Sequence, residues 1–469
     1  MIKFGTGGWR AIIGDEFIKS NICLLAQAVA EDMNQAEKGR GVVIGYDRRF
    51  LSETAAEWAA EVFAGNGIPV YFIDRIAPTP LIMFSVRRLG TKYGMAITAS
   101  HNPASYNGIK IFTEGGRDAG EDVTKRLEAI AAGQPEVRSL PFRDGTEAGL
   151  IRKCATQNEY IDSILGMVNV DAIRSRNLRI LLDPMYGVSR TSLMTILMTA
   201  RCEVELIHDR RDPLFGGRLP APTEKTLASL INMVVEQGYD LGIATDGDAD
   251  RIGIIDDLGH FIHPNNILVL LYYYLLEYKG WSGDAVRNIA TTELLDRIAE
   301  DHGCVCHEVP VGFKHISSAM EKYDALIGGE SSGGLTIRGH IPGKDGIFAA
   351  ALLVEMLSVT GKKMSEMLSE IYAKYGRAEM AEFDTRFSAQ KKEELKRILF
   401  TEKFVPDLTA AGKKILSANY MDGVKFRFGG GWIIVRFSGT EPLLRIFCEA
   451  EDRETAEKII RITAGQLGL

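Results

Sequence analysis

YGMAITAS (residues 93–100) is matched at the same spacing by YDLGIATD (239–246) and YDALIGGE (323–330). In each segment a tyrosine opens a short apolar run, which is typical of a buried parallel strand. A polar, potentially reactive residue stands seven positions after the tyrosine: Ser100, Asp246 or Glu330. The pattern predicts three related α/β domains, each with a reactive side chain at the end of a strand.

Two further apolar runs, separated by a helical pattern, precede each of these segments. The paired runs are 42–45 with 68–73, 179–182 with 204–207, and 288–291 with 305–309. Strands that alternate with helices indicate right-handed crossovers and mixed, mostly parallel sheets. Ligands bind beyond the carboxyl ends of such strands, so Ser100, Asp246 and Glu330 are expected around one central cleft.

The C-terminal part of the chain follows a different pattern. GVKFRF (423–428), GGWIIVRFS (430–438) and LLRIFCEA (443–450) alternate like antiparallel strands, and a helical pattern follows over 451–466. The 469 residues also exceed the roughly 250–300 at which one core splits into domains. We predict α/β domains over 1–148, 149–254 and 255–375, which carry the loops of Ser100, Asp246 and Glu330, and an α+β domain over 376–469.

Composition excludes several classes of partner. The net charge is -7 and no basic stripe stands out, so nucleic acid is not expected, and a small molecule is the favoured partner. The longest apolar stretch, around 267–276, is too short to span a bilayer, and the N-terminus lacks a signal region. The six scattered cysteines fit free thiols in a reducing compartment, and a cytoplasmic location is expected.

Two loops carry the chemistry of phosphorus and metal. In TASHNP (98–103) a serine ends a buried strand, where it is exposed for attack at phosphorus. In DGDADR (246–251) three carboxylates alternate and Gly247 permits a tight bend, which favours Mg2+. A helix-loop-helix calcium site would need glutamate where Asp257 stands, and would need helices where the flanking runs look like strands.

Two later loops offer groups that recognise a sugar phosphate. GGESSGG (328–334) presents Glu330 and Ser332 on flexible backbone, which suits neighbouring sugar hydroxyls. RFSGT (436–440) combines a cation, two hydroxyls and a bend of backbone amides into a phosphate cradle.

TASHNP, DGDADR, GESSGG and RFSGTEP, in this order, resemble the four active-site loops of the α-D-phosphohexomutase superfamily, and KFGTGGWR (3–10) is similar to its N-terminal signature. The resemblance covers essentially the whole chain. It implies a mutase that moves a phosphoryl group between the 1- and 6-positions of a hexose phosphate through phosphoserine 100 and a 1,6-bisphosphate. The implied cofactors are Mg2+ and, as activator, glucose 1,6-bisphosphate.

The resemblance also implies a role for each matching residue. The implied metal ligands are Ser100, through its phosphate, with Asp246, Asp248 and Asp250. The implied catalytic groups are Ser100, His101 and Lys110. The reaction also requires a general base, for which either Lys110 or His101 is expected, and Arg251 beside the aspartates is expected to neutralise phosphate charge. The implied substrate-binding residues are Arg10, Lys314, Glu330, Ser332, Arg436, Ser438, Gly439 and Thr440.

Three positions bear on metal binding and on which sugar is preferred. Ala249 stands where many members of the superfamily have glycine, and its added methyl group is expected to leave metal binding intact. Gly334 stands where members that prefer glucosamine, or accept mannose and glucose, often have the histidine of Ser-Gly-His. GFK (312–314) is similar to an element of glucose-specific members and places Lys314 opposite the substrate, so both features favour glucose.

Other activities stay open at this point. Phosphomannomutase or phosphoglucosamine mutase activity would use the same loops. A phosphoserine-type sugar phosphatase would transfer the phosphoryl group to water, but would not need a cradle for the far phosphate. A non-catalytic sugar-phosphate sensor would not need Ser100 beside three aspartates.

Overall fold

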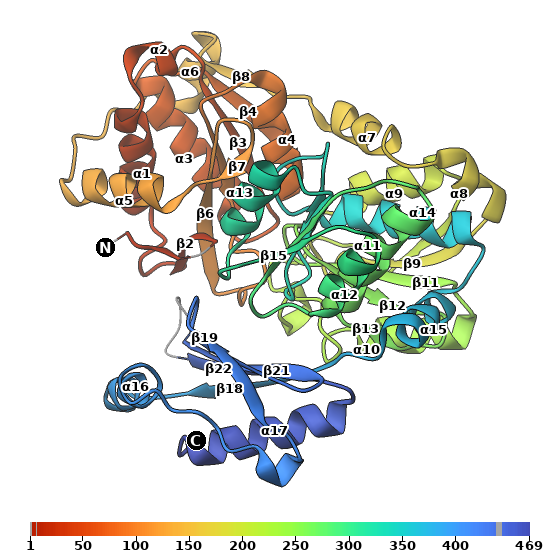
Figure 1. Ribbon diagram of the computed structural model, residues 1–469. Helices are drawn as coiled ribbons and strands as arrows, with labels where there is room; N and C mark the ends of the chain where they lie inside the picture. Colours follow the sequence, from red (N-terminus) through yellow and green to blue (C-terminus); the bar gives the residue numbers. More distant parts are fainter. Residues whose placement is uncertain (1, 6, 438–442) are drawn as a thin grey trace. The chain divides into compact units, whose positions relative to one another are not determined.

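The computed structural model describes residues 2–5, 7–437 and 443–469 (Figure 1). They form three α/β domains with mixed sheets and a C-terminal α+β domain, which confirms the predicted fold class. The chain separates into two compact units, one made of 1–274 with 332–365 and the other of 275–331 with 366–469. The predicted third domain, 255–375, is therefore divided between the units, and the exact domain limits stay a prediction.

The first sheet has the strand order β1-β2-β6-β5-β3-β4-β8, with β7 paired to β6. Its parallel strands are β3 (Val42–Tyr46), β4 (Val70–Ile76), β5 (Tyr93–Ile97) and β8 (Ile151–Lys153). Its antiparallel strands are β1 (Phe4–Gly5), β2 (Gly8–Ile12), β6 (Tyr106–Thr113) and β7 (Arg117–Asp118). The parallel strands β3 and β5 end side by side, so the loops that follow them are neighbours.

Helices cover this sheet because their small and branched residues pack on the inner strands. The helices are α1 (Lys19–Asp32), α2 (Gln35–Lys38), α3 (Ser52–Gly65), α4 (Thr79–Leu89), α5 (Glu121–Ala132) and α6 (Phe142–Glu147). Buried residues of α1, α3 and α5 share one core with β3 and β5. Helix α4 packs closely on the same strands, since a β-carbon at Gly94 would lie 2.3 Å from a methyl group of Val86.

The second sheet, also in the first unit, has the order β10-β9-β11-β12-β13. Strands β9 (Arg179–Asp183), β10 (Glu203–Leu206) and β11 (Leu241–Thr245) are parallel, and β12 (Ile252–Ile255) and β13 (Phe261–Ile262) are antiparallel. The helices of this region are α7 (Gln157–Leu165), α8 (Val170–Arg176), α9 (Arg190–Thr199) and α10 (Ala228–Gln237). Helix α14 (Gly346–Thr360), which follows β17 (Leu335–Ile337), packs on α8, α9, β11 and β12.

The second unit contains a parallel group of strands and an antiparallel sheet. The parallel group is β15 (Cys306–Val309), β14 (Ala285–Asn288) and β16 (Ile327–Gly329), with α12 (Leu294–Asp301) and α13 (Phe313–Tyr323). The antiparallel sheet has the order β18 (Glu379–Arg386), β22 (Leu443–Ala450), β21 (Gly431–Phe437), β20 (Val424–Phe428) and β19 (Ile415–Asn419), with α16 (Ala389–Lys396) and α17 (Arg453–Gln466).

These two parts of the second unit share an apolar core. Ile289 and Ala290, just beyond β14, pack with Trp432, Ile434 and Phe447 of the antiparallel sheet. The unit therefore holds its strands together by hydrophobic burial as well as by chain connection.

The third repeat differs in detail from its prediction. The strand predicted over 288–291 lies over Ala285–Asn288, because the Asn288 side chain accepts hydrogen bonds from Ala290 N and Thr291 Oγ1 and turns the chain. Tyr323 ends α13 instead of opening a strand. Glu330 nevertheless follows directly after β16, as Ser100 and Asp246 follow β5 and β11.

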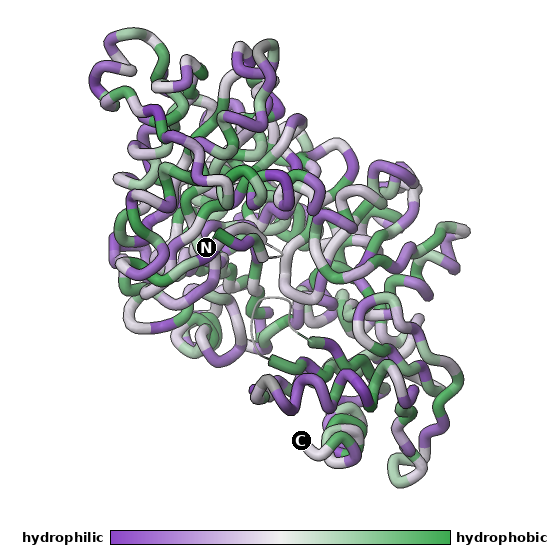
Figure 2. The backbone as a smooth tube through the Cα atoms, turned by 90° about the vertical axis from the view of Figure 1, so that its left-hand side faces the viewer, coloured by the Kyte–Doolittle hydropathy of each residue, from purple (hydrophilic) through white to green (hydrophobic). Residues whose placement is uncertain are grey.

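Two helices contain residues from both units: α11 (Pro264–Glu277) and α15 (Met364–Tyr375). Within the described residues, no helix combines the length and the apolar character that crossing a membrane requires. Figure 2 shows hydrophobic stretches interrupted by hydrophilic residues along the tube.

Candidate active site

Ser100 lies at the centre of a cluster of polar side chains in the first unit. It follows β5 and is 1% exposed, and its Oγ donates a hydrogen bond of 2.8 Å to Asp246 Oδ2. Nδ1 of His101 lies 3.4 Å from the same Oγ. The backbone of Ser100 has φ 53°, a left-handed conformation that costs a non-glycine residue about 1–3 kcal/mol and persists only where the surroundings fix it.

Asp246, Asp248 and Asp250 form a compact acidic cluster in the loop between β11 and β12. All three are buried, and one oxygen from each lies within 4.8 Å of the others. Asp248 Oδ1 and Asp250 Oδ1 have no hydrogen-bond partner among the described residues. Buried carboxylates of like charge repel one another, and hard oxygen atoms left unsatisfied fit a divalent cation such as Mg2+.

The acidic loop (residues 246–251) and the serine loop (residues 98–105) lie very close to one another. A β-carbon at Gly247 would lie 2.7 Å from the carbonyl oxygen of Ser100, so glycine is needed there for close approach. The left-handed residue of the loop is Ala249, with φ 61°. This explains why glycine suits position 249, and alanine is the smallest residue that can stand in for it.

Two lysines neutralise the acidic cluster. Lys110 of β6 places its Nζ 2.6 Å from Asp248 Oδ2 and 2.7 Å from Asp250 Oδ2. Lys344, which the sequence interpretation missed, places its Nζ 3.1 Å from Asp250 Oδ2.

Two arginines contact side chains of the loop that contains Ser100. Arg251 Nη1 lies 2.6 Å from His101 Nδ1, and Arg10 Nη1 of β2 donates a bond of 2.6 Å to Asn102 Oδ1. The site therefore combines a nucleophile, three carboxylates and four cations, which is the composition that phosphoryl transfer requires.

Burial and neighbouring charges shift the pKa values of this cluster in opposite directions. Burial, followed by the charges of Asp248 and Asp250, raises the pKa of Asp246 well above its usual value. Burial also acts to raise the pKa of Asp250, but the neighbouring cations, led by Lys110, outweigh it and hold that pKa well below the usual value.

The two groups considered as general base also differ. Burial acts to lower the pKa of Lys110, but Asp248 and Asp250 outweigh it and raise that pKa above its ordinary value. Burial, followed by the charge of Arg251, lowers the pKa of His101 well below its ordinary value. Before a cation is added, Lys110 is thus protonated and His101 is neutral at pH 7.

Thr79, the first residue of α4, is a further contact that sequence reasoning missed. Its Oγ1 donates a bond of 2.6 Å to Asp248 Oδ2, and its N donates to the main-chain oxygen of Asp248. Thr79 and Asp248 are 169 positions apart, and no local pattern marks the pair.

The remaining predicted residues are divided between the two units. Ser332 belongs to the first unit, and Lys314, Glu330 and Arg436 belong to the second. Lys314 is the second residue of α13, and Glu330 follows β16 and is buried. Arg436 Nε donates a bond of 2.9 Å to Asp422 Oδ1. Ser438, Gly439 and Thr440 lie outside the described residues.

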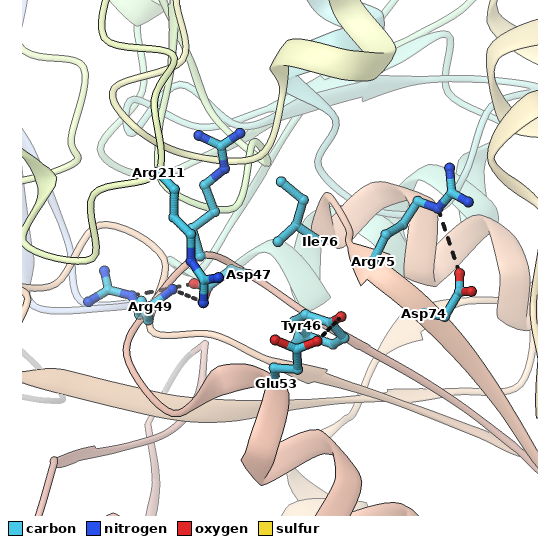
Figure 3. Close-up of a pocket in the computed structure, with 9 residues that line it drawn as sticks. Tyr46, Asp47, Arg49, Glu53, Asp74, Arg75, Ile76 and Arg211 are labelled. Atoms are coloured by element: carbon cyan, nitrogen blue, oxygen red, sulfur yellow. Dashed lines mark hydrogen bonds and ion pairs between the residues drawn. The ribbon is translucent and has the colours of Figure 1, made fainter.

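A cavity of about 300 Å³ lies in the first unit, at the carboxyl ends of β3 and β4 (Figure 3). None of the predicted site residues lines it. One side of the cavity is formed by Asp47 and Arg49, which belong to the loop beside Ser100.

Four family models match the chain in consecutive order. They are described as "Phosphoglucomutase/phosphomannomutase, alpha/beta/alpha domain" I, II and III, at residues 1–138, 158–259 and 263–375, and as the C-terminal domain of the same family, at residues 377–465.

Individual proteins match over nearly the whole chain. A phosphoglucomutase/phosphomannomutase of Thermococcus kodakarensis is 32% identical over 98% of this chain and 97% of its own. A phosphoglucosamine/phosphogalactosamine mutase of Sulfurisphaera tokodaii is 28% identical over 97% of each chain. A solved structure from Thermus thermophilus, provisionally assigned as a phosphomannomutase, is 30% identical, covers 100% of this chain and 99% of its own, and has a TM-score of 0.86.

Proposed function

The chain belongs to the phosphoglucomutase/phosphomannomutase family of the α-D-phosphohexomutase superfamily, and on this premise we propose that it interconverts α-D-glucose 1-phosphate and glucose 6-phosphate. Membership makes it an enzyme of the phosphohexomutase type, an isomerase that acts on phosphorylated sugars. The observation that carries the proposal is the Ser100 hydroxyl bonded to Asp246 within a buried cluster of carboxylates and cations.

In the proposed reaction, phosphorylated Ser100 donates its phosphoryl group to the free hydroxyl of the sugar monophosphate. The bond between phosphorus and Oγ breaks, and a bond between phosphorus and the sugar oxygen forms. Either His101, which is neutral, accepts the hydroxyl proton directly, or Lys110 accepts it after giving up its own proton. The resulting 1,6-bisphosphate turns around, and its other phosphate returns to Ser100. Loss of the bisphosphate would leave Ser100 unphosphorylated, so added glucose 1,6-bisphosphate is expected to act as activator.

We assign the metal to Asp246, Asp248 and Asp250, together with the phosphate on Ser100. When bound, Mg2+ supplies positive charge that offsets the charge of the transferring phosphoryl group. Lys110 and Lys344 hold the carboxylates in place, and Arg10 and Arg251 present cations on the side of His101.

Recognition of the substrate is assigned to residues outside the cluster. Glu330, Ser332 and Lys314 are proposed to bind sugar hydroxyls. The non-reacting phosphate is proposed to lie against Arg436 and the loop of Ser438, Gly439 and Thr440.

Glucose is the favoured sugar because of Gly334 and Lys314. A β-carbon at position 334 would lie 2.2 Å from Lys344 Cδ, so a histidine there would displace the lysine that contacts Asp250. Glucosamine 1-phosphate is the second candidate, since a related archaeal protein is a phosphoglucosamine/phosphogalactosamine mutase.

The test is the initial rate with α-glucose 1-phosphate, with Mg2+ and a trace of glucose 1,6-bisphosphate. Mannose 1-phosphate and glucosamine 1-phosphate are measured at the same concentration. We expect glucose to be turned over at least about tenfold faster, since one sugar hydroxyl changes binding by only a few kcal/mol. Equal turnover of another sugar would overturn the choice of glucose, and net release of inorganic phosphate would favour a phosphatase.

A further inference from the structure

Arg49 binds four main-chain carbonyl oxygens in and directly after the serine loop. Its Nη1 donates to Pro103 O at 2.9 Å and to Tyr106 O at 3.0 Å. Its Nη2 donates to Ser100 O and Asn102 O, both at 2.7 Å. We propose that Arg49 is a positioning residue that holds Ser100 in its reactive conformation, an inference that rests on the proposed function.

The chemistry of the contact calls for a guanidinium group. Four carbonyl oxygens from positions 100 to 106 converge, and their partial negative charges repel one another and an incoming phosphate. A planar guanidinium offers paired donors in a rigid fork, whereas a lysine ammonium concentrates three donors at one point. Arg49 is therefore suited to bind the folded loop as a whole, including the left-handed backbone of Ser100.

Arg49 is itself fixed from several sides. Its Nε lies 3.4 Å from Asp47 Oδ2, and Asp47 Oδ1 accepts bonds from Arg49 N at 2.9 Å and Ser52 Oγ at 2.7 Å. The guanidinium carbon lies 4.8 Å from the centre of the Phe215 ring. Figure 3 shows Asp47 and Arg49 joined beside the cavity. Because these contacts fix the Arg49 side chain, its four hydrogen bonds restrict the conformation of the loop that it binds.

The contacts leave Arg49 little capacity for substrate. Its side chain is buried, and the four N–H groups of its two Nη atoms are matched by four carbonyl oxygens. Loss of Arg49 should therefore affect the step at Ser100, which appears in kcat, and should leave the binding of sugar phosphate, which appears in KM, nearly unchanged.

The test compares Arg49→Lys and Arg49→Ala with the parent enzyme. We expect kcat to fall about 100-fold in both variants, since a misplacement of about 1 Å has this effect, while KM stays within about twofold. Added guanidinium is expected to restore part of kcat in Arg49→Ala only. Amide hydrogen exchange over residues 99–107 is expected to be faster in both variants.

Arg179→Lys is the matched control. Arg179 also donates to two main-chain carbonyl oxygens and lies over an aromatic ring, Tyr239, but it is remote from the serine loop in its contacts. The Arg179→Lys variant should therefore have the same kcat as the parent enzyme.

Several outcomes would overturn the inference: a kcat within threefold of the parent, a rise in KM at unchanged kcat, or unchanged exchange over 99–107. If Arg49→Lys does not fold, Ser52→Ala takes its place, because it removes one bond to Asp47. A smaller fall in kcat at constant KM is then expected, and an unchanged kcat contradicts the inference. If the parent transfers no phosphoryl group to any hexose phosphate, the proposed function is wrong, and the exchange comparison alone decides the role of Arg49.

Discussion

Ser100 and Asp246 are 146 positions apart in the chain, and the hydroxyl of one is bonded to the carboxylate of the other. Replacing Ser100 by alanine should lower kcat by more than about 10³-fold, as expected for loss of a nucleophile. The melting temperature should fall by only a few degrees, since the change removes one hydrogen bond worth about 1 kcal/mol. Ser105→Ala, on the same loop but exposed, is the control that should keep full activity. Undiminished turnover by Ser100→Ala would exclude the phosphoserine route.

Asp248 provides a test of the metal site that does not depend on turnover. A ligand present at 100 times its Kd stabilises a folded protein by about 2.7 kcal/mol, so Mg2+ should raise the melting temperature measured in EDTA. Asp248→Asn should abolish this rise. Asp256→Asn is the control, because Asp256 is equally buried but lies outside the acidic cluster, and it should keep the rise. A rise of the same size in Asp248→Asn would mean that the cation binds elsewhere.

The loop that contains Gly334 is coupled to Lys344. Gly334→Ala should push Lys344 away from Asp250, because the new methyl group would overlap the lysine side chain. We expect kcat/KM to fall by about tenfold or more. The double variant with Lys344→Ala should be no worse than Lys344→Ala alone, since residues in contact are not additive. Gly429→Ala, where a β-carbon meets nothing within 4 Å, is the control. Additive losses would mean that position 334 acts independently of Lys344.

Sequence periodicity was sufficient for the strands that precede Ser100 and Asp246, but it misplaced the limits of the strands in the third repeat. Ser100, Asp246 and Glu330 each come directly after, or within three residues of, a parallel strand, as the threefold pattern predicts. The strands β18 and β19 were not predicted, because nearly all of their residues are half-buried or exposed and their sequences lack a strong apolar pattern.

The contacts between distant loops could not be predicted from the sequence. Arg49 follows the buried strand β3 as Ser100 follows β5, and this placement was the available signal. Its four carbonyl partners, and the approach of Thr79 to Asp248, depend on how the loops fold together in space. The roles of the residues in catalysis and binding stay predictions until the variants are measured.

In the second unit, a buried group of charges joins the parallel strands to the antiparallel sheet. Arg287 Nη1 of β14 lies 2.6 Å from Glu308 Oε2 of β15, and Lys425 Nζ of β20 lies 2.7 Å from the same oxygen. Both cations are fully buried. This group of charges and the apolar core around Trp432 both join the parallel strands β14–β16 to the antiparallel sheet of the C-terminal domain. We therefore expect the C-terminal domain to move together with β14–β16 when substrate binds.

The pH dependence of stability tests this group of charges. Burial acts to raise the pKa of Glu308, but Arg287 and then Lys425 outweigh it and lower that pKa to about 2 from the usual 4.5. Because the folded-state value is the lower one, the stabilisation is complete above pH 4.5 and is lost as the pH falls toward 2. Glu308→Gln should cost about 3–5 kcal/mol at pH 7, since it leaves buried cations without this partner.

Urea unfolding of the parent and of Glu308→Gln from pH 7 to pH 3 measures the difference. The gap between the two midpoints should narrow below pH 4.5. Glu454→Gln, at an exposed position in α17, should give no gap at any pH. A gap of constant size down to pH 3 would mean that Glu308 acts through packing and not through its charge.

The division of the chain after Ser331 also bears on how the preferred sugar substrate of such an enzyme can change during evolution. Ser100, the three aspartates and both lysines of the reacting cluster belong to the first unit, while Lys314, Glu330 and Arg436 belong to the second. On the proposed assignment, mutations at Lys314, Glu330 and Arg436 alter sugar binding within the second unit, whereas Ser332 and Gly334 lie in the first. We expect that exchanging residues 275–334 and 366–469 between relatives, which adds Ser332 and Gly334 to the second unit's residues, will exchange their preferred sugars and keep the reaction at Ser100.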